Sequence, residues 1–106
     1  MRLLLAALFI ACSGLAYAED PTFELTIRDH KFSPSELTVP AGKKIKLLVK
    51  NEDASAEEFE SKKLNREKVI PGKSQATIFV GPLAPGEYPF VGEFHESTAS
   101  GKLIAK

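Results

Sequence analysis

Hydrophobic and polar residues alternate along most of the chain from Thr22 onward. Phe23, Leu25 and Ile27 are apolar and the residues between them are polar or charged. One face of this segment is therefore apolar and the other is suited to solvent. A period of two residues is typical of β-strands that are buried on one side. The same pattern recurs in segments 37–39, 45–50 and 76–80, and a further strand is expected at 87–94.

Glycine and proline residues separate these alternating segments. Turn signals stand at Pro40-Ala41-Gly42, Pro71-Gly72, Gly81-Pro82 and Pro85-Gly86. A further strand is expected within 62–70 and a last one at 102–106, while 51–60 is a polar, acid-rich stretch and 57–65 has the alternative of one helical turn. The sequence therefore predicts an all-β fold, a Greek-key antiparallel β-sandwich of about seven strands.

The first 18 residues follow a different pattern. A short positive start is followed by the apolar run Leu3–Ala11 and by Ala16-Tyr17-Ala18, which places small residues at the positions that signal peptidase reads. We expect a signal peptide at 1–18 and one domain at 19–106 in the periplasm. The apolar run is about half of the ~20 residues that cross a bilayer, so no membrane-inserted segment is expected. The alternative, lipidation of Cys12, fits poorly with the residues before it.

Charge and cysteine content narrow the function classes. The chain carries 14 basic and 14 acidic residues, and the loss of Arg2 with the leader keeps the two nearly balanced, so no nucleic-acid partner and no global attraction to anionic lipid are expected. The single cysteine, Cys12, lies in the leader, which leaves the domain without a disulfide or a thiolate ligand. The chain also lacks a nucleophile elbow, a phosphate loop and a recognisable acid pair, which disfavours a hydrolase.

Several motifs resemble those of one known family. The stretch from Phe32 to Gly42, followed by 44–51, resembles the second and third strands of a cupredoxin. The segments 86–88, 92–95 and 101–104 resemble the closing hairpin of that fold, with a glycine that opens the last strand. The resemblance covers nearly the whole domain and implies a cupredoxin-like sandwich.

The copper ligands of that family are where this sequence departs from it. A type 1 copper site uses two histidines, a cysteine thiolate and usually an axial methionine. By the resemblance, His95 matches the C-terminal histidine, but Gly92 stands at the cysteine position and Glu57 stands near the first histidine. The methionine region reads Ser97-Thr98-Ala99. No type 1 blue copper centre is therefore expected.

Carboxylates and imidazoles remain as candidate ligands, and they bind iron, Cu(II), Zn or Mn in less constrained geometries. In a cupredoxin-like sandwich the loops that carry them meet at one end. If Phe59 faces the core, alternation turns Glu57 to the same side and Glu58 outward, which favours Glu57. The alternative is a solvated acidic loop with ordinary surface histidines. The predicted metal ligands are His95, Glu57, Glu58, His30 and Glu93, with Glu96 as a further candidate.

Segments 56–61, 64–67 and 92–95 resemble a subgroup of small periplasmic cupredoxin-like proteins associated with bacterial iron uptake through high-affinity iron permeases. The resemblance implies that iron or copper ions bind at the His95 end of the domain and are presented to, or oxidised for, a membrane permease. An enzymatic role is left open. The alternative from another class is a metal-free cupredoxin-fold interaction module that docks to a partner complex.

Overall fold

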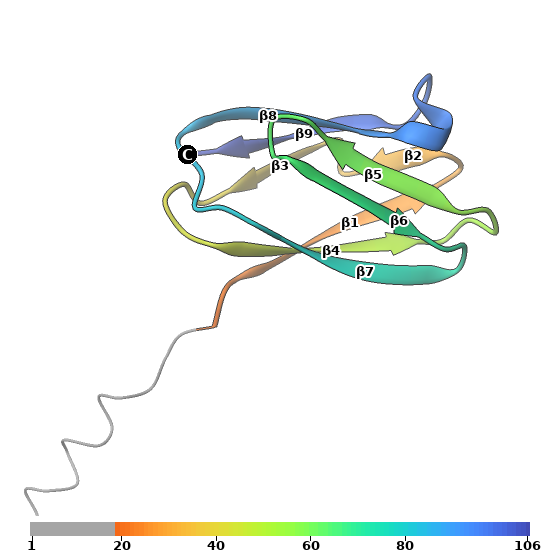
Figure 1. The fold of residues 1–106 in the computed structure, drawn as a ribbon, viewed down its shortest axis with the longest axis horizontal. Helices are drawn as coiled ribbons and strands as arrows, with labels where there is room; N and C mark the ends of the chain where they lie inside the picture. The colour runs from red at the N-terminus through yellow and green to blue at the C-terminus, as the bar shows by residue number, and fades with distance from the viewer. Residues whose placement is uncertain (1–18) are drawn as a thin grey trace, which may run out of the picture.

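The computed structural model describes residues 19–106, and the expected signal peptide with Cys12 lies outside the described residues. Two β-sheets pack face to face (Figure 1), with strand orders β2-β1-β4-β7 and β3-β9-β8-β5-β6. Among the described residues, no helix has the length and apolar character that a membrane crossing requires. The all-β sandwich expected from the sequence is confirmed. Its elements are β1 (Thr22–Arg28), β2 (Lys31–Ser33), β3 (Glu36–Val39), β4 (Ile45–Asn51), β5 (Glu57–Ser61), β6 (Arg66–Ile70), β7 (Ser74–Val80), β8 (Gly86–Gly92), the 3₁₀ turn η2 (Glu93–His95) and β9 (Ser100–Ala105).

The strands of the described chain number nine instead of about seven, and two of them carry no clear pattern in the sequence. Strand β2 is three residues long, which is too short to show a period. Strand β5 is rich in glutamate, yet its residues alternate between buried and half-buried, so segment 57–61 is a strand and not a helical turn.

Two strand pairs also differ from the expected antiparallel arrangement. Strands β1 and β4 run parallel, as do β3 and β9. Between β1 and β4 the chain passes through β2 and through β3 in the other sheet, and it then returns beside β1 in the original direction. The remaining ladders are antiparallel.

The apolar faces of both sheets form one core. The rings of Phe32 and Phe59 both pack on Phe90, with ring centroids 4.9 and 5.1 Å apart. All members of this core lie between Leu25 and Ala105. Residues 19–106 therefore contain the whole of this core.

Candidate metal centre

Glu57 places a carboxylate inside the protein at the start of β5. Its neighbours on the same face of the strand, Phe59 and Ser61, are also buried, and Glu57 itself is 1% exposed. Glu57 Oε1 accepts hydrogen bonds from the backbone N–H groups of Glu58 at 2.9 Å and Phe94 at 2.8 Å. The inward direction that strand alternation predicts for Glu57 is therefore what the structure shows.

The other carboxylate oxygen faces an imidazole. Glu57 Oε2 lies 2.7 Å from Nδ1 of His95, whose side chain is 29% exposed. When Nδ1 is protonated, it donates to the carboxylate, and such charge-assisted hydrogen bonds are short and strong. The backbone carbonyl of His95 accepts hydrogen bonds from the N–H groups of Thr98 at 3.1 Å and Ala99 at 2.8 Å. These bonds hold residues 95–99 in a tight turn.

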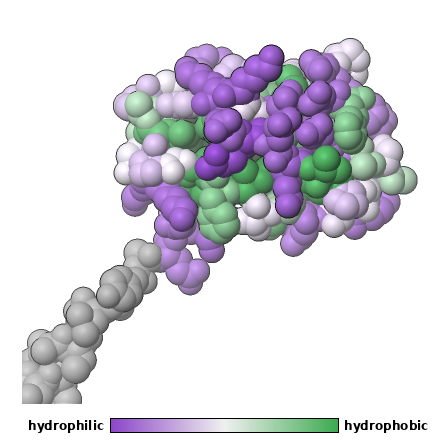
Figure 2. Space-filling model, in the orientation of Figure 1, coloured by the Kyte–Doolittle hydropathy of each residue, from purple (hydrophilic) through white to green (hydrophobic). Residues whose placement is uncertain are grey.

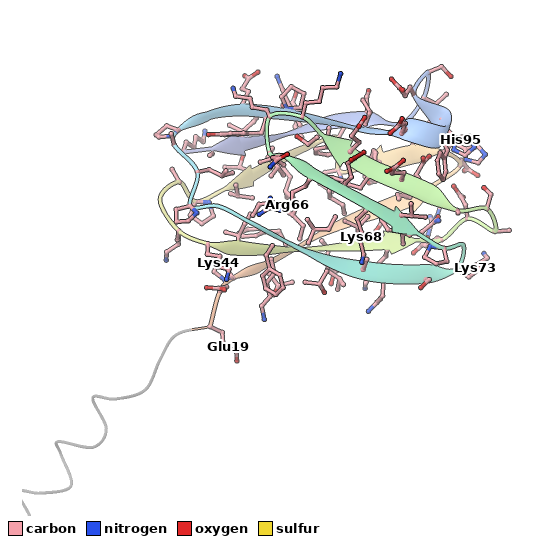
Figure 3. All side chains as sticks on the ribbon, in the orientation of Figure 1. Glu19, Lys44, Arg66, Lys68, Lys73 and His95 are labelled. Carbon is pink, nitrogen blue, oxygen red and sulfur yellow. The ribbon has the colours of Figure 1, made fainter. Side chains whose placement is uncertain are left out.

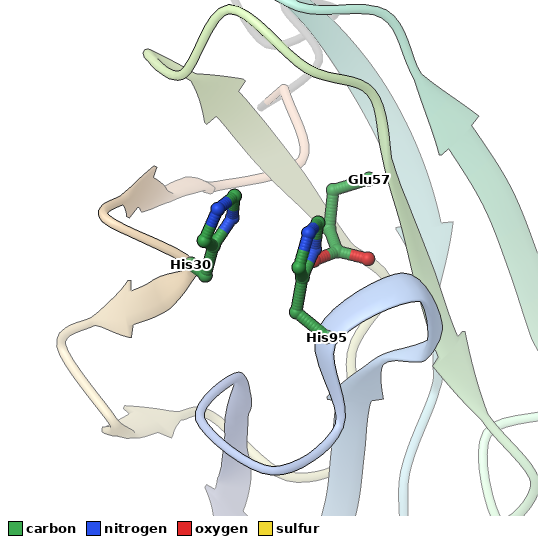
Figure 4. A group of neighbouring side chains, drawn as sticks. All are labelled: His30, Glu57 and His95. Atoms are coloured by element: carbon green, nitrogen blue, oxygen red, sulfur yellow. The ribbon is translucent and has the colours of Figure 1, made fainter.

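His30 reaches the same place from the turn between β1 and β2. Its ring stacks on that of His95, with centroids 3.6 Å apart and an interplanar angle of 14° (Figure 4). Asp29 and His30 have φ values of 54° and 58°. Positive φ at both central residues is the geometry of a type I′ two-residue hairpin, and here it directs His30 toward η2.

The hairpin is fastened to its surroundings by Asp53. The Asp53 carboxylate accepts the backbone N–H groups of Asp29 at 2.8 Å and His30 at 3.0 Å. The hydroxyl of Thr98 donates to the His30 carbonyl at 2.7 Å, which ties the hairpin to the loop after η2. Sequence reasoning missed Asp53 and Thr98 because contacts between distant loops leave no local pattern.

Together His30, Glu57 and His95 offer one ligand atom each, all within 4.8 Å of one another. A carboxylate and two imidazoles form a donor set that suits iron, Cu(II), Zn or Mn. The carboxylate is already oriented by two backbone N–H groups, so little ordering remains to be done when a cation binds.

The surroundings of Gly92 leave no room for a thiolate side chain at that position. A Cβ atom at position 92 would lie 2.7 Å from Cδ of Glu57 and 2.8 Å from Cβ of Ala99. The Glu57 carboxylate therefore occupies the space that a side chain at Gly92 would need. A type 1 copper ion does not fit these residues, because the domain from Glu19 onward has no cysteine.

The structure divides the five predicted ligands into two groups. Glu58 and Glu93 do not join His30, Glu57 and His95 but lie with Glu67, their carboxylate oxygens within 4.8 Å of one another. This acidic group includes Glu67 of β6, which sequence reasoning did not select because the pairing of β5 with β6 was unknown. The further candidate Glu96 belongs to neither group.

Burial and neighbouring carboxylates raise the pKa of two glutamates at this acidic surface, Glu93 and Glu60. Desolvation, followed by the charge of Glu58, raises the pKa of the Glu93 carboxyl above its ordinary value. Desolvation, followed by the charge of Glu93, likewise raises the pKa of Glu60. The folded state therefore holds these protons more tightly than the unfolded chain does.

We predict that Glu93→Gln stabilises the domain at neutral pH. A raised folded-state pKa favours folding below the ordinary value, and this contribution is lost as pH rises through the folded pKa. The gain of the variant over wild type should therefore be largest near pH 7 and vanish by about pH 4. Urea denaturation between about pH 4 and about pH 7 measures the difference in the free energy of unfolding between variant and wild type, with Glu96→Gln as the control. A difference that does not change with pH would contradict the prediction.

Asp53 should have the opposite pH dependence. The backbone N–H of His30 is the main cause that holds the pKa of Asp53 below its ordinary value of 3.8. A lowered folded-state pKa stabilises the fold above the ordinary value, and this stability is lost as pH falls through the folded pKa. Asp53→Asn should therefore be less stable than wild type at about pH 7, and the difference should shrink below about pH 4. Urea denaturation of both proteins tests this, and a constant difference would contradict it.

Comparison with known proteins gives the family. A family model described as the cupredoxin-like domain matches residues 1–105. The uncharacterized protein RP394 of Rickettsia prowazekii (strain Madrid E) is 44% identical over 81 residues, which cover 76% of this chain and 65% of that protein. The iron uptake system component EfeO of Escherichia coli (strain K12) is 32% identical over 111 residues, which cover 100% of this chain and 28% of that protein. The chain thus spans less than two thirds of either relative.

Solved structures with the same fold include copper proteins. Auracyanin A, a "blue" copper protein from Chloroflexus aurantiacus, superposes with a TM-score of 0.68 at 18% identity, covering 81% of this chain and 99% of that one. The metal binding domain of the Cu(I) exporting P-type ATPase CopA from Streptococcus pneumoniae D39 gives a TM-score of 0.70 at 11% identity, covering 86% and 91%. At these identities the likeness establishes the fold alone.

Proposed function

The chain belongs to the cupredoxin-like domain family, and we propose that it binds iron or copper ions through His30, Glu57 and His95 as a periplasmic accessory to metal uptake. The metal is cargo in this proposal and not a resident electron-transfer centre. The observation that carries it is the buried Glu57 carboxylate, which faces an imidazole at the same end of the sandwich as a second, stacked imidazole.

Stability alone does not account for this arrangement. A buried carboxylate and its partner lose hydration, and apolar residues of similar volume commonly stabilise a fold at least as well as such a pair. The structure nevertheless gives Oε1 of Glu57 two backbone donors, places Oε2 2.7 Å from Nδ1 of His95 and leaves His95 partly open to solvent. An ordered carboxylate beside accessible imidazoles is the arrangement that cation binding needs.

The donor set constrains which ion is carried. Carboxylate oxygen favours harder cations such as Fe(III), and imidazole nitrogen favours Cu(II) and also accepts iron. Without a thiolate, bound copper would give none of the intense blue colour of a type 1 site. Iron and copper therefore both belong in the binding test.

The proposed setting is the periplasm, and the proposed partner is a membrane permease for metal ions. The leader-like pattern of 1–18 supports export. Similarity to part of EfeO, whose name places it in an iron uptake system, supports a role in uptake. The domain would capture the ion and present it to the permease.

Metal titration of residues 19–106 tests the proposal. Metal-stripped protein should bind one Cu(II) or Fe(III) ion, and His95→Ala should weaken this binding by about 100-fold or more. Glu58→Ala is the matched control, because Glu58 adjoins Glu57 but faces the opposite side of β5. Fe(II) is titrated in parallel. Equal, weak binding by all three proteins would refute the metal proposal.

A metal-free interaction module is the second candidate. Phe94, which follows Glu93 in η2, is 51% exposed and lies directly before His95. An exposed aromatic ring is a common anchor for a protein partner. Failure of every ion to bind, together with a folded domain, would favour this candidate.

A further inference from the structure

Basic side chains gather along one side of the sandwich. Strands β4 and β7, together with the turn that leads into β7, contain no aspartate or glutamate. Figure 3 shows four basic residues spread along this side, from Lys44 near one end to Lys73 near the end that carries His95. Together with Lys46 of β4, these four residues form what we call the basic strip, whose members are Lys44, Lys46, Arg66, Lys68 and Lys73.

The strip is assembled from both sheets. Strand β7 is an edge of the first sheet and β6 is an edge of the second, and the two edges lie beside each other (Figure 1). Arg66 of β6 donates from Nε to the carbonyl of Phe79 in β7 at 2.9 Å. This bond fixes the side chain across the seam between the sheets.

An exposed aromatic ring lies within the strip. Phe79 is 44% exposed, and the Nζ atoms of Lys44 and Lys46 lie 5.2 and 5.9 Å from the centre of its ring. Cation–π attraction holds the two ammonium groups there. The space-filling view likewise shows hydrophobic patches set among hydrophilic side chains on this side (Figure 2).

Carboxylates interact with the strip only weakly: the charge of Lys73 is the last of the causes that lower the pKa of Asp53. The ion pairs found among residues 19–106 use Arg28, Lys50, Lys102 and the two histidines, and none uses a member of the strip. The acidic group takes Glu58 from β5, Glu93 from η2 and Glu67 from β6, where Glu67 stands between Arg66 and Lys68 of the strip and joins Glu58 and Glu93. The strip therefore holds five basic groups without a salt bridge among the described residues, on a molecule whose net charge is near zero, which leaves a local positive field along the strip.

We propose that the basic strip docks the protein on the surface of an anionic phospholipid bilayer. A row of lysines that extends along the domain is complementary to a layer of anionic headgroups. The lone Phe79 ring suits the boundary between headgroups and acyl chains. An acidic protein partner is disfavoured, because protein interfaces rely on a larger apolar centre than one ring. Docking is independent of the metal site and would hold that site near the membrane.

Vesicle binding by residues 19–106 tests the proposal, since this segment omits the apolar leader. Binding to phosphatidylglycerol-containing vesicles should exceed binding to pure phosphatidylcholine vesicles and should weaken as salt is added. Each lysine near such a surface changes binding by about fivefold, so Lys44→Gln with Lys46→Gln should lower the affinity by about 30-fold. Lys68→Gln with Lys73→Gln should cause a comparable loss.

The control variant removes two positive charges, as the test variants do, but from lysines outside the basic strip. Lys31 and Lys62 are exposed and lie outside the strip, so the double variant Lys31→Gln and Lys62→Gln should retain most of the vesicle affinity. An equal loss in this control would overturn the proposal, as would equal binding to both kinds of vesicle. The proposal would also be overturned if residues 19–106 bound an acidic protein but bound neither kind of vesicle. The metal titration is read separately, so the failure of one proposal does not imply failure of the other.

Discussion

Replacing Glu57 with alanine should abolish metal binding and lower the free energy of unfolding by about 3 kcal/mol. The alanine side chain leaves the backbone N–H groups of Glu58 and Phe94 without their acceptor, and His95 Nδ1 loses its partner. The variant also creates a cavity in front of Gly92, where the carboxylate now packs. Both effects add to the loss of the anionic ligand.

Urea denaturation and metal titration of the same preparations separate these effects. Glu57→Gln keeps the shape of the side chain and one carbonyl acceptor but removes the charge, so it should recover much of the stability and little of the metal affinity. Glu58→Ala should change the metal affinity little, since its side chain faces away from the site. Full metal affinity in a folded Glu57→Ala protein would show that Glu57 takes no part in binding.

Introducing the missing thiolate with Gly92→Cys should not create a blue copper centre. The new Cβ would meet Cδ and Oε2 of Glu57 at 2.7 and 2.8 Å, so the carboxylate must move or the strand must shift. Overpacking of this kind costs about 1–3 kcal/mol. The variant should be less stable than wild type and should lack the intense absorption of a Cu(II)–thiolate bond.

Absorption spectra with Cu(II) and urea denaturation check this prediction. Gly92→Ser is the matched control, because it adds nearly the same volume without sulfur and should lose similar stability. An intense blue band in the single Gly92→Cys variant would mean that the Glu57 carboxylate does not hold the thiolate position.

Much of the fold was predictable because its longer strands are buried on one face only. Strand β1 alternates cleanly, and Phe23, Leu25 and Ile27, the apolar positions of the predicted strand, all lie within its observed bounds Thr22–Arg28. The sequence did not reveal β2, which has three residues, or β5, whose charged composition resembles a loop. Strand β5 owes its place to pairing with β6 and β8 on either side, which no local pattern records.

The site was predictable only as a set of residue types. Alternation identified the inward direction of Glu57, and the family resemblance brought its loop and that of His95 to one end. The placement of Glu93 with Glu58 and Glu67 depends on cross-strand register, and the stacking of His30 on His95 depends on the hairpin geometry that Asp53 supports. These are tertiary contacts, so periodicity and spacing cannot report them.

Locating a bound ion is the most direct test of the metal site. Crystals of residues 19–106 loaded with Cu(II) or Fe(III) would show the ion by anomalous diffraction. We predict one peak at the Glu57 and His95 end of the sandwich, within about 2.3 Å of Oε2 of Glu57 and a ring nitrogen of His95. A peak confined to the carboxylates of Glu58, Glu67 and Glu93, or no peak in a fully loaded crystal, would contradict the assignment.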